Sequence, residues 1–330
     1  MRTMKIGRSG IEASVVGLGA WAIGGDSQWG ASDDAESIRT IHRARDLGVT
    51  LIDTAPAYGL GHSEEVVGKA LAGRRGDYVL ATKCGIRWDV EEGALLMERD
   101  GVRIVRNSRP ERLAEEVEMS LRRLQTDYID IYIVHWQALP EFPCPIADTM
   151  GYLTKLKQQG KIRAIGASNL LPEQFVEYTN AGQLDLIQEK FSLLDRIAEG
   201  KFFDLCDLHG VAFQVYSPLE RGTLTGKITV DSQVELTRAK STIKWFQSEN
   251  LPKIAALAEK WEPLCKKYDC SMTQLVIAWT AAQGNGSNVN VLCGARKLHQ
   301  IEENAKGGDV VLDPADANSM RQDTQGLATT

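Results

Sequence analysis

Residues 128–135 read Tyr-Ile-Asp-Ile-Tyr-Ile-Val-His, an apolar run that contains one acidic residue and ends in a histidine. A strand that is apolar toward both faces is typical of a parallel sheet covered by helices on each side. An amphipathic stretch from about Ile146 to Gln158 follows it. Together the two segments predict a strand-and-helix unit, and the chain repeats this alternation in both directions.

The alternation extends over nearly the whole chain. The predicted strands are Val15–Leu18, Thr50–Asp53, Tyr78–Lys83, Tyr128–His135, Ala164–Ser168, Leu186–Glu189, Ala212–Ser217 and Val289–Cys293. The predicted helices are Asp34–Leu47, His62–Ala72, Ser108–Leu124, Ile146–Gln158, Pro172–Ala181, Phe202–Leu208, Pro252–Tyr268, Ser271–Gln283 and Leu298–Lys306. No Pro/Gly/Ser-rich linker interrupts them. Although 330 residues also suit two domains, we expect an α/β fold, a (β/α)8 TIM barrel, built as a single domain over residues 1–330.

Two helix starts carry a capping pattern. Asp33-x-x-Glu36 precedes the helix from Asp34, and Ser108-x-x-Glu111 precedes a helix with Pro110 in its first turn. In such a capping box the first side chain accepts a hydrogen bond from the backbone amide three residues later. Both Asp33 and Ser108 are therefore expected to be N-caps.

Two long segments, residues 84–107 and 219–250, interrupt the alternation, and each follows a strand rather than a helix. Loops in that position open onto the catalytic face of a (β/α)8 barrel. We therefore expect both segments to lie over the mouth of the active site.

Composition and charge exclude several classes of protein. The chain has 38 basic and 44 acidic residues, a net charge of −6, and no basic run that would follow a phosphate backbone, so nucleic acid is not an expected partner. No signal peptide and no long apolar window occur, so we expect no membrane association and a cytoplasmic location. The six cysteines form no C-x-x-C pair and are interpreted as buried thiols, and the five histidines lack the spacing of metal ligands, so no metal is expected.

Polar residues stand where the predicted strands end. They are Asp53, Lys83, His135, Ser168, Asn169, Gln188 and Ser217, with Tyr58 just after Asp53. Strand ends of a barrel converge on one mouth, so these side chains can meet there. A lysine ammonium stabilises a nearby phenolate and lowers the pKa of the tyrosine, which suits acid catalysis. In this hypothesis Asp53 orients Lys83, and His135 donates a hydrogen bond to the substrate oxygen. Each residue alone also fits a structural role, such as a loop cap, a solvated charge or a core histidine.

The first predicted strand offers a competing interpretation. Gly17-Leu18-Gly19-Ala20-Trp21-Ala22 matches G-x-G-x-x-A, the dinucleotide fingerprint of the doubly wound fold. That fingerprint requires a helix to begin within the motif, whereas Ile23-Gly24-Gly25-Asp26 continues as a loop. We therefore place these glycines in the first loop of the barrel mouth.

Several motifs resemble the aldo-keto reductase superfamily in order and spacing, from about Ile6 to Asp313. They are Asp53-Thr-Ala-Pro-Ala-Tyr58-Gly59, Gly61-His62-Ser63-Glu64-Glu65, Ala81-Thr82-Lys83, Ile133-Val134-His135, the segment Gly160–Asn169, and Gly294-Ala295-Arg296 followed by Glu303-Asn304. The chain is most similar to bacterial NADPH-dependent members that have the Gly-Ala-Arg motif. The resemblance implies a carbonyl reductase on a (β/α)8 barrel, with Asp53, Tyr58, Lys83 and His135 as its catalytic tetrad.

The resemblance also implies where the cofactor binds. The cofactor-binding positions are Ser168, Asn169, Gln188, Tyr216, Ser217, Leu219, Gly222, Thr225, Lys227, Gly294, Arg296, Gln300, Glu303 and Asn304. Tyr216 would stack on the nicotinamide ring. Arg296 would bind a 2′-phosphate, because a guanidinium can bind phosphate through two hydrogen bonds, so NADPH is preferred over NADH. Two departures from the family pattern are Val291–Gly294, which lacks a common proline, and the charged pair Glu220-Arg221.

Tryptophans are frequent in the expected mouth loops and just past strand ends. The expected pocket residues are Trp21, Trp29, Trp88, Trp136 and Trp245. Because aromatic faces stack on sugars, we expect a sugar or polyol aldehyde such as an oxidised hexose; the same rings also suit plain pocket walls. The pattern is similar to reductases of sugar degradation. The expected partner is a small-molecule carbonyl compound, and the sequence fits a monomer as well as a homo-oligomer.

Three other functions fit parts of this pattern. A Schiff-base aldolase would use Lys83 at its strand end. A glycosidase would pair Asp53 with a second carboxylate, for example Asp26. A cofactor-sensing binding subunit with slow turnover, as in some ion-channel relatives of the family, would keep the cofactor site.

Overall fold

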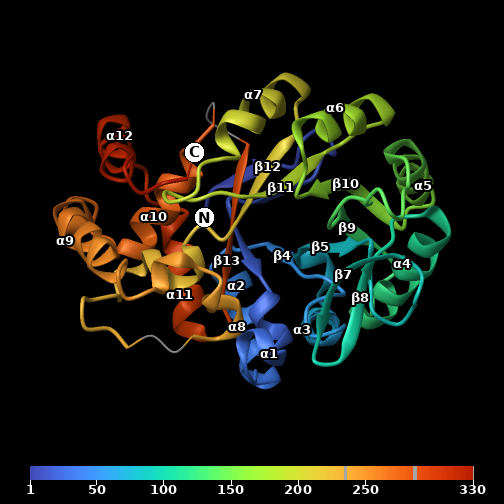
Figure 1. Ribbon diagram of the computed structural model, residues 1–330, viewed down its shortest axis with the longest axis horizontal. Helices are drawn as coiled ribbons and strands as arrows, with labels where there is room; N and C mark the ends of the chain where they lie inside the picture. Colours follow the sequence, from blue (N-terminus) through green and yellow to red (C-terminus); the bar gives the residue numbers. More distant parts are fainter. Residues whose placement is uncertain (234–235, 285–287, 330) are drawn as a thin grey trace.

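A closed barrel of parallel strands forms the centre of the structure and confirms the predicted (β/α)8 TIM barrel. The computed structural model describes residues 1–233, 236–284 and 288–329. Figure 1 shows the helices arranged around the central strands. Neighbouring strands in the barrel are parallel throughout. Their order around the barrel is β10 (Ile162–Ser168), β11 (Leu186–Lys190), β12 (Ala212–Tyr216), β13 (Val289–Gly294), β3 (Val16–Gly19), β4 (Leu51–Asp53), β5 (Val79–Cys84) and β9 (Ile129–Val134).

The helices agree with the predicted ones to within a few residues. They are α2 (Asp34–Asp46), α3 (His62–Leu71), α4 (Pro110–Leu124), α5 (Ile146–Gln158), α6 (Pro172–Ala181), α7 (Glu199–His209), α9 (Leu251–Lys267), α10 (Met272–Ala281) and α11 (Leu298–Gly307). The short α1 (Asp26–Trp29) and the terminal α12 (Pro314–Asp323) were not predicted. In the part of the chain that the structure describes, every helix is too short or too polar to span a membrane.

The two predicted N-caps have different outcomes. The Asp33 carboxylate accepts a hydrogen bond from the Glu36 amide at 3.0 Å, which confirms the cap of α2. The prediction for Ser108 is wrong, because the N-cap of α4 is Arg109 and Pro110 is the first helical residue. Proline disfavours helical backbone in the residue before it, so Arg109 stays extended (φ −63°, ψ 142°) and the helix cannot begin earlier.

An antiparallel hairpin of β1 (Thr3–Lys5) and β2 (Glu12–Ser14) packs against the barrel interior. Its apolar side chains share one buried cluster with one face of the barrel strands. The cluster consists of Met4, Ile6, Ile11, Ala13, Val15, Leu51, Ala81, Ile131, Ile133, Ala164, Leu186, Ala212 and Leu292. This hairpin therefore fills the end of the barrel opposite the carboxyl ends of the strands.

The apolar interior continues into polar residues toward the carboxyl ends of the strands. Strand side chains alternate between two faces, so residues two positions apart point the same way. The apolar and polar partners are Leu51 and Asp53, Ala81 and Lys83, and Ile133 and His135. The fold thus directs the three polar side chains into one mouth.

Both long excursions contain regular structure. Residues 84–107 form a three-stranded antiparallel sheet, and residues 219–250 form short helical turns, with residues 234 and 235 of that predicted mouth loop outside the described part. The elements are β6 (Ile86–Arg87), β7 (Ala94–Arg99), β8 (Val102–Arg106), η3 (Glu220–Thr225), α8 (Arg238–Ser241) and η4 (Lys244–Phe246).

Each excursion reaches residues next to Tyr58. From the first, Arg99 donates through Nη2 to the Ala57 carbonyl at 3.0 Å. From the second, the Arg221 guanidinium lies 5.0 Å from the ring centroid of Trp21, and that ring lies 6.0 Å from the Tyr58 ring.

Candidate active site

The side chain of Lys83 is completely buried and uses all its hydrogen-bond donors. Its Nζ donates to Asp53 Oδ1 at 2.6 Å, to the Thr54 carbonyl at 3.0 Å and to the Tyr58 hydroxyl at 3.1 Å. An ammonium has three N–H groups, so none is left over. Burial lowers the pKa of Lys83, but Asp53 and Tyr58 together raise it by more. The net pKa therefore lies above the ordinary value. Lys83 is therefore a cation.

Tyr58 accepts a hydrogen bond from Lys83, so its own O–H is left to donate elsewhere. Burial raises the pKa of Tyr58, whereas Lys83 lowers it and Asp53 raises it, and the net pKa lies above the ordinary value. The predicted net lowering is therefore wrong, because burial outweighs the nearby ammonium. The phenol stays protonated, which is the form that donates a proton.

His135 directly follows β9 and presents its ring to Tyr58. The two ring centroids are 5.9 Å apart and the planes are nearly perpendicular, at 86°. Burial holds the pKa of His135 well below its usual value, and the charges of Lys83 and Arg106 lower the pKa further. The imidazole is therefore neutral, with one N–H that can donate. The structure thus brings all four residues of the predicted tetrad together.

A chain of buried amides crosses the barrel interior beside the tetrad. Gln188 donates through Nε2 to Asp53 Oδ2 at 2.9 Å and to Gln214 Oε1 at 2.6 Å. Gln214 donates to Asn290 Oδ1 at 2.8 Å, and Asn290 donates to the Ser14 carbonyl at 2.8 Å. Sequence analysis missed Gln214 and Asn290, and the available signal was a polar residue inside an otherwise apolar strand. Gln188, the first of these amides, holds Asp53 Oδ2, while Lys83 holds Oδ1. The Asp53 carboxylate is therefore fixed through both of its oxygens.

The predicted nicotinamide residues cluster next to His135. Asn169 donates through Nδ2 to the His135 carbonyl at 3.0 Å and to Ser168 Oγ at 3.1 Å. The Tyr216 hydroxyl donates to Asn169 Oδ1 at 2.8 Å. The Ser168 hydroxyl donates to the Gln188 carbonyl at 2.6 Å. An aromatic face beside several amide and hydroxyl groups fits a flat ring that bears a carboxamide.

The segment Ser217–Lys227, the expected pyrophosphate site, has an unusual backbone. Left-handed φ angles occur at Ser217 (57°), Glu220 (46°), Arg221 (56°) and Gly222 (105°). The Glu220 and Gly222 amides donate to the carbonyls of Ser217 and Leu219 at 3.0 and 2.9 Å, so the segment folds into tight turns. The unexpected charged pair has structural partners: Glu220 accepts from the Ser192 hydroxyl at 2.7 Å, and Arg221 donates to Thr242 Oγ1 at 2.9 Å.

The predicted adenosine-end residues form a second cluster. The contacts are Lys227 with Glu303 at 3.2 Å, the Arg296 amide with Gln300 Oε1 at 3.0 Å, and Asn304 Nδ2 with the Gly294 carbonyl at 3.2 Å. The Arg296 guanidinium donates to the carbonyls of Trp29 and Ala31 at 3.3 and 3.1 Å, and pairs with no carboxylate among the described residues. At the predicted departure Val291–Gly294, β13 extends as far as Gly294, which pairs with Gly19. A guanidinium without a carboxylate partner fits an anionic group.

Three of the predicted pocket tryptophans lie close to the tetrad. Trp21 lies against Tyr58, and Trp29 packs edge-on against Trp21 with centroids 5.3 Å apart. Trp136 immediately follows His135. Trp21 and Trp29 therefore form an aromatic part of the mouth beside Tyr58.

The other two tryptophans have different surroundings. Trp88 lies 5.8 Å from the guanidinium of Arg123, which donates to the buried Glu64 at 2.6 Å. Trp245 is only 5% exposed and belongs to the apolar core. The structure does not bring either ring to the tetrad, so their predicted pocket role has no support from the geometry.

Two arginines of the first excursion were missed by sequence analysis. Arg99 pairs with Asp26 at 3.3 Å and so connects the sheet to the first mouth loop. Arg106 lies with its guanidinium 4.6 Å from the ring centroid of Trp136. The only signal was a cation within a predicted mouth loop.

Glu116 of α4 supports the turn that follows Lys83. Its Oε2 accepts from the Gly85 amide at 2.7 Å, and the residue is buried. Burial is the main cause that raises the pKa of Glu116, to about 8, although the Gly85 amide lowers the pKa. The folded chain therefore keeps a proton on Glu116 at a pH where the unfolded chain has lost it.

This raised pKa predicts a fall in stability with pH. Between the unfolded pKa of 4.5 and the folded value of about 8, the folded state binds more protons, so the free energy of unfolding falls by up to about 1.4 kcal/mol per pH unit. Glu116→Gln keeps an acceptor for Gly85 and is expected to reduce this fall in urea unfolding between about pH 5 and about pH 8. Glu118→Gln, on the half-exposed face of α4, is the matched control. An unchanged pH dependence in Glu116→Gln would contradict the assignment.

Comparisons with known proteins agree with this geometry. The model of the Aldo/keto reductase family matches residues 15–323. An NADH-specific methylglyoxal reductase of Escherichia coli (strain K12) is 43% identical over 329 residues, 99% of each chain. An aldo-keto reductase of Bacillus subtilis (strain 168) is 39% identical over 305 residues, 92% of this chain and 87% of the relative. The structure of a glycerol dehydrogenase from Gluconobacter oxydans superposes with a TM-score of 0.87 and 36% identity, over 98% of this chain and 95% of that one.

Proposed function

Because the chain belongs to the aldo/keto reductase family, we propose that it reduces the carbonyl group of a small aldehyde or ketone to an alcohol, with Tyr58 as the proton donor. The observation that carries this proposal is the full use of the Lys83 ammonium, which bonds to Asp53, Thr54 and Tyr58 at once. A phenol that accepts from a cation and keeps its own proton is prepared to act as an acid.

The chain's residues divide the proton chemistry among them. A reduced nicotinamide, when bound, supplies the hydride for the carbonyl carbon. Tyr58 gives its Oη proton to the carbonyl oxygen, and the N–H of neutral His135 donates a hydrogen bond to the same oxygen. Lys83 stabilises the phenolate that remains on Tyr58, and Asp53 balances the charge of Lys83.

Two alternatives fit the geometry less well. A Schiff-base lysine must attack as a neutral amine, but Lys83 is a buried cation with every donor bonded. A glycosidase needs two available carboxyl groups, whereas Asp53 is paired with Lys83 at 2.6 Å and Asp26 with Arg99 at 3.3 Å.

For the substrate we propose a sugar or polyol aldehyde. Trp21 lies against Tyr58 and offers an aromatic face for a hydroxylated carbon chain. Two relatives support small oxygenated substrates, since one is named for methylglyoxal, an aldehyde, and the other for glycerol, a polyol. The test follows NADPH absorbance with sugar dialdehydes and hydroxyaldehydes, and Tyr58→Phe as control. Tight NADPH binding without turnover of any aldehyde would favour the cofactor-sensing role.

For the cofactor we propose NADPH, with Arg296 as the residue that binds its 2′-phosphate. The support is the Arg296 guanidinium, which has no carboxylate partner among the described residues and donates only to the carbonyls of Trp29 and Ala31. The Escherichia coli relative is named as NADH-specific, so NADH is the alternative.

Arg296→Ala separates the two cofactors. The KM for NADPH is expected to rise about 10- to 100-fold, because a charge-assisted contact is lost, while the KM for NADH changes little. Lys297→Ala, which removes the exposed neighbouring cation, is the control. Equal effects on both cofactors would show that Arg296 acts only through its bonds to Trp29 and Ala31.

A further inference from the structure

The C-terminal end of α9 brings two cysteines together. The Cys270 amide donates to the Cys265 carbonyl at 3.0 Å, and the Asp269 amide donates to the Lys266 carbonyl at 3.4 Å. Asp269, after the C-cap Tyr268, has a left-handed φ of 47°. This pair of bonds defines a Schellman motif, and the two residues joined by its longer-range bond frequently make a side-chain contact. Here those positions hold Cys265 and Cys270.

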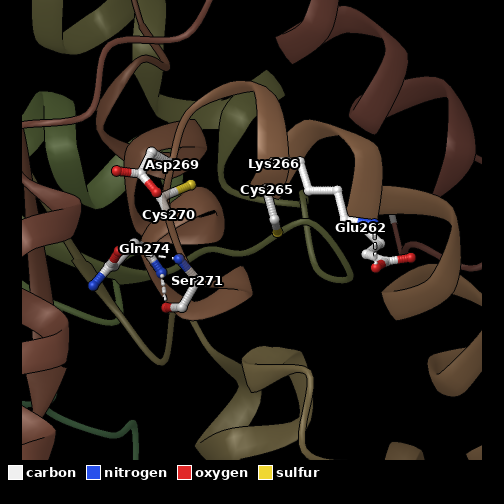
Figure 2. Close-up of a pocket in the computed structure, with 7 residues that line it drawn as sticks. All are labelled: Glu262, Cys265, Lys266, Asp269, Cys270, Ser271 and Gln274. Carbon is white, nitrogen blue, oxygen red and sulfur yellow. Dashed lines mark hydrogen bonds and ion pairs between the residues drawn. The ribbon is translucent and has the colours of Figure 1, made fainter.

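Both thiols are free, partly exposed and line one surface hollow. Figure 2 shows Cys265 at the end of the helix and Cys270 on the following turn, with Ser271 and Gln274 beside it. A direct bond between the two residues joins the Cys270 amide to the Cys265 carbonyl at 3.0 Å. The prediction of buried thiols is confirmed for Cys84, Cys206 and Cys293 but is wrong for Cys144, Cys265 and Cys270. Helix ends face solvent, which explains the exposure of this pair.

We propose that Cys265 and Cys270 are a modification site, a dithiol that a hydroperoxide converts to a disulfide. One thiolate attacks the O–O bond and gives a sulfenic acid, and an alcohol or water leaves. The second thiol attacks that sulfur, the S–S bond forms and water leaves. Two thiols are oxidised and one hydroperoxide is reduced. The backbone bond of 3.0 Å already holds the two residues side by side, so an S–S bond of about 2.05 Å requires rotation of the side chains and a shift of the turn.

The pair is suited to slow and lasting oxidation. Burial raises the pKa of Cys270 to about 11, with a further contribution from Cys265. Burial also raises the pKa of Cys265. Weakly acidic thiols are rarely thiolates near neutral pH, and thiols of high pKa are poor leaving groups when a disulfide is reduced. The disulfide therefore forms slowly and persists.

This turn is connected to the proposed cofactor site, and this consequence, unlike the disulfide itself, rests on the proposed function. Ser271 directly follows Cys270 and donates to Glu303 Oε1 at 2.9 Å. Glu303 in turn pairs with Lys227 at 3.2 Å. A shift of Cys270 on forming the S–S bond also moves the adjacent Ser271, so we expect the bond from Ser271 to Glu303 to weaken. Oxidation is therefore expected to weaken NADPH binding.

Peptide mapping tests the disulfide. Lys266 and Lys267 lie between the two cysteines, so trypsin separates Cys265 from Cys270 unless a disulfide joins them. After hydrogen peroxide treatment, alkylation and digestion without reductant, we expect joined peptides that separate on reduction. The joined peptides should be absent from Cys265→Ser and Cys270→Ser and present in Cys144→Ser. Their rate of formation should increase between about pH 7 and about pH 9.

Several outcomes would overturn the proposal in part or in full. Separate peptides with sulfinic or sulfonic acids, or joined peptides that contain Cys144, would exclude the pair. In fluorescence titration, oxidised parent is expected to bind NADPH about fivefold more weakly, with no effect of peroxide on Cys270→Ser. Joined peptides with unchanged affinity would overturn only the connection through Ser271. Absence of NADPH binding in the reduced chain would instead contradict the proposed function.

Discussion

A Tyr58→Phe variant is expected to reduce aldehydes with a kcat about a thousandfold below that of the parent, because the substitution removes the only proposed proton donor. The ring remains, so its contacts with Trp21 and His135 are kept. The affinity for NADPH should therefore stay close to the parent value. Steady-state kinetics and a separate binding titration distinguish these two effects.

The matched control is Tyr132→Phe. Tyr132 is also buried, on β9, and its hydroxyl has no hydrogen-bond partner among the described residues, so its loss should leave kcat unchanged. If Tyr58→Phe keeps more than about a tenth of the parent kcat, another group donates the proton.

Lys83→Met is expected to lower the free energy of unfolding by about 3–5 kcal/mol, because it leaves the Asp53 carboxylate buried without its cation. Asp53 is only 3% exposed, and the distance between Asp53 Oδ1 and Lys83 Nζ is 2.6 Å. Asp53→Asn should also destabilise, since it leaves the buried Lys83 charge unpaired. Urea unfolding at neutral pH measures both effects.

The double variant Asp53→Asn/Lys83→Met shows whether the two charges depend on each other. The double variant should lose clearly less unfolding free energy than the two single variants together, because neither buried charge is then left unpaired. Lys266→Met, which breaks an exposed pair with Glu262, should change stability little. If the losses of unfolding free energy simply add, Asp53 and Lys83 do not stabilise the fold through their interaction with each other.

The fold and tetrad were predictable because both depend on local patterns. Strand periodicity relates Lys83 to Ala81 and His135 to Ile133, so the polar strand ends had to share the barrel mouth with Asp53 once the fold was assigned. The spacing along the chain carries this information without any knowledge of distances.

Other features depend on packing that a linear pattern does not contain. The pKa of Tyr58 follows from burial by residues far apart in sequence, and burial outweighs the neighbouring charge. Gln214 and Asn290 became meaningful only when their strands were seen side by side. The start of α4 depends on two local patterns that conflict. The capping pattern favours a cap at Ser108, but Pro110 keeps Arg109 extended, so Arg109 is the N-cap.

The bond from Asn290 to the backbone of residues 14 and 15 also concerns how the chain reaches its native state. It crosses the seam between β13 and β3, which joins positions about 275 residues apart. Contacts of such long range close large loops and form slowly. On the ribosome, a chain without β13 is an open sheet whose edge strands are β3 and β12, and such edges favour association with other chains. Synthesis of β13 therefore sets the earliest moment at which the barrel is protected from aggregation.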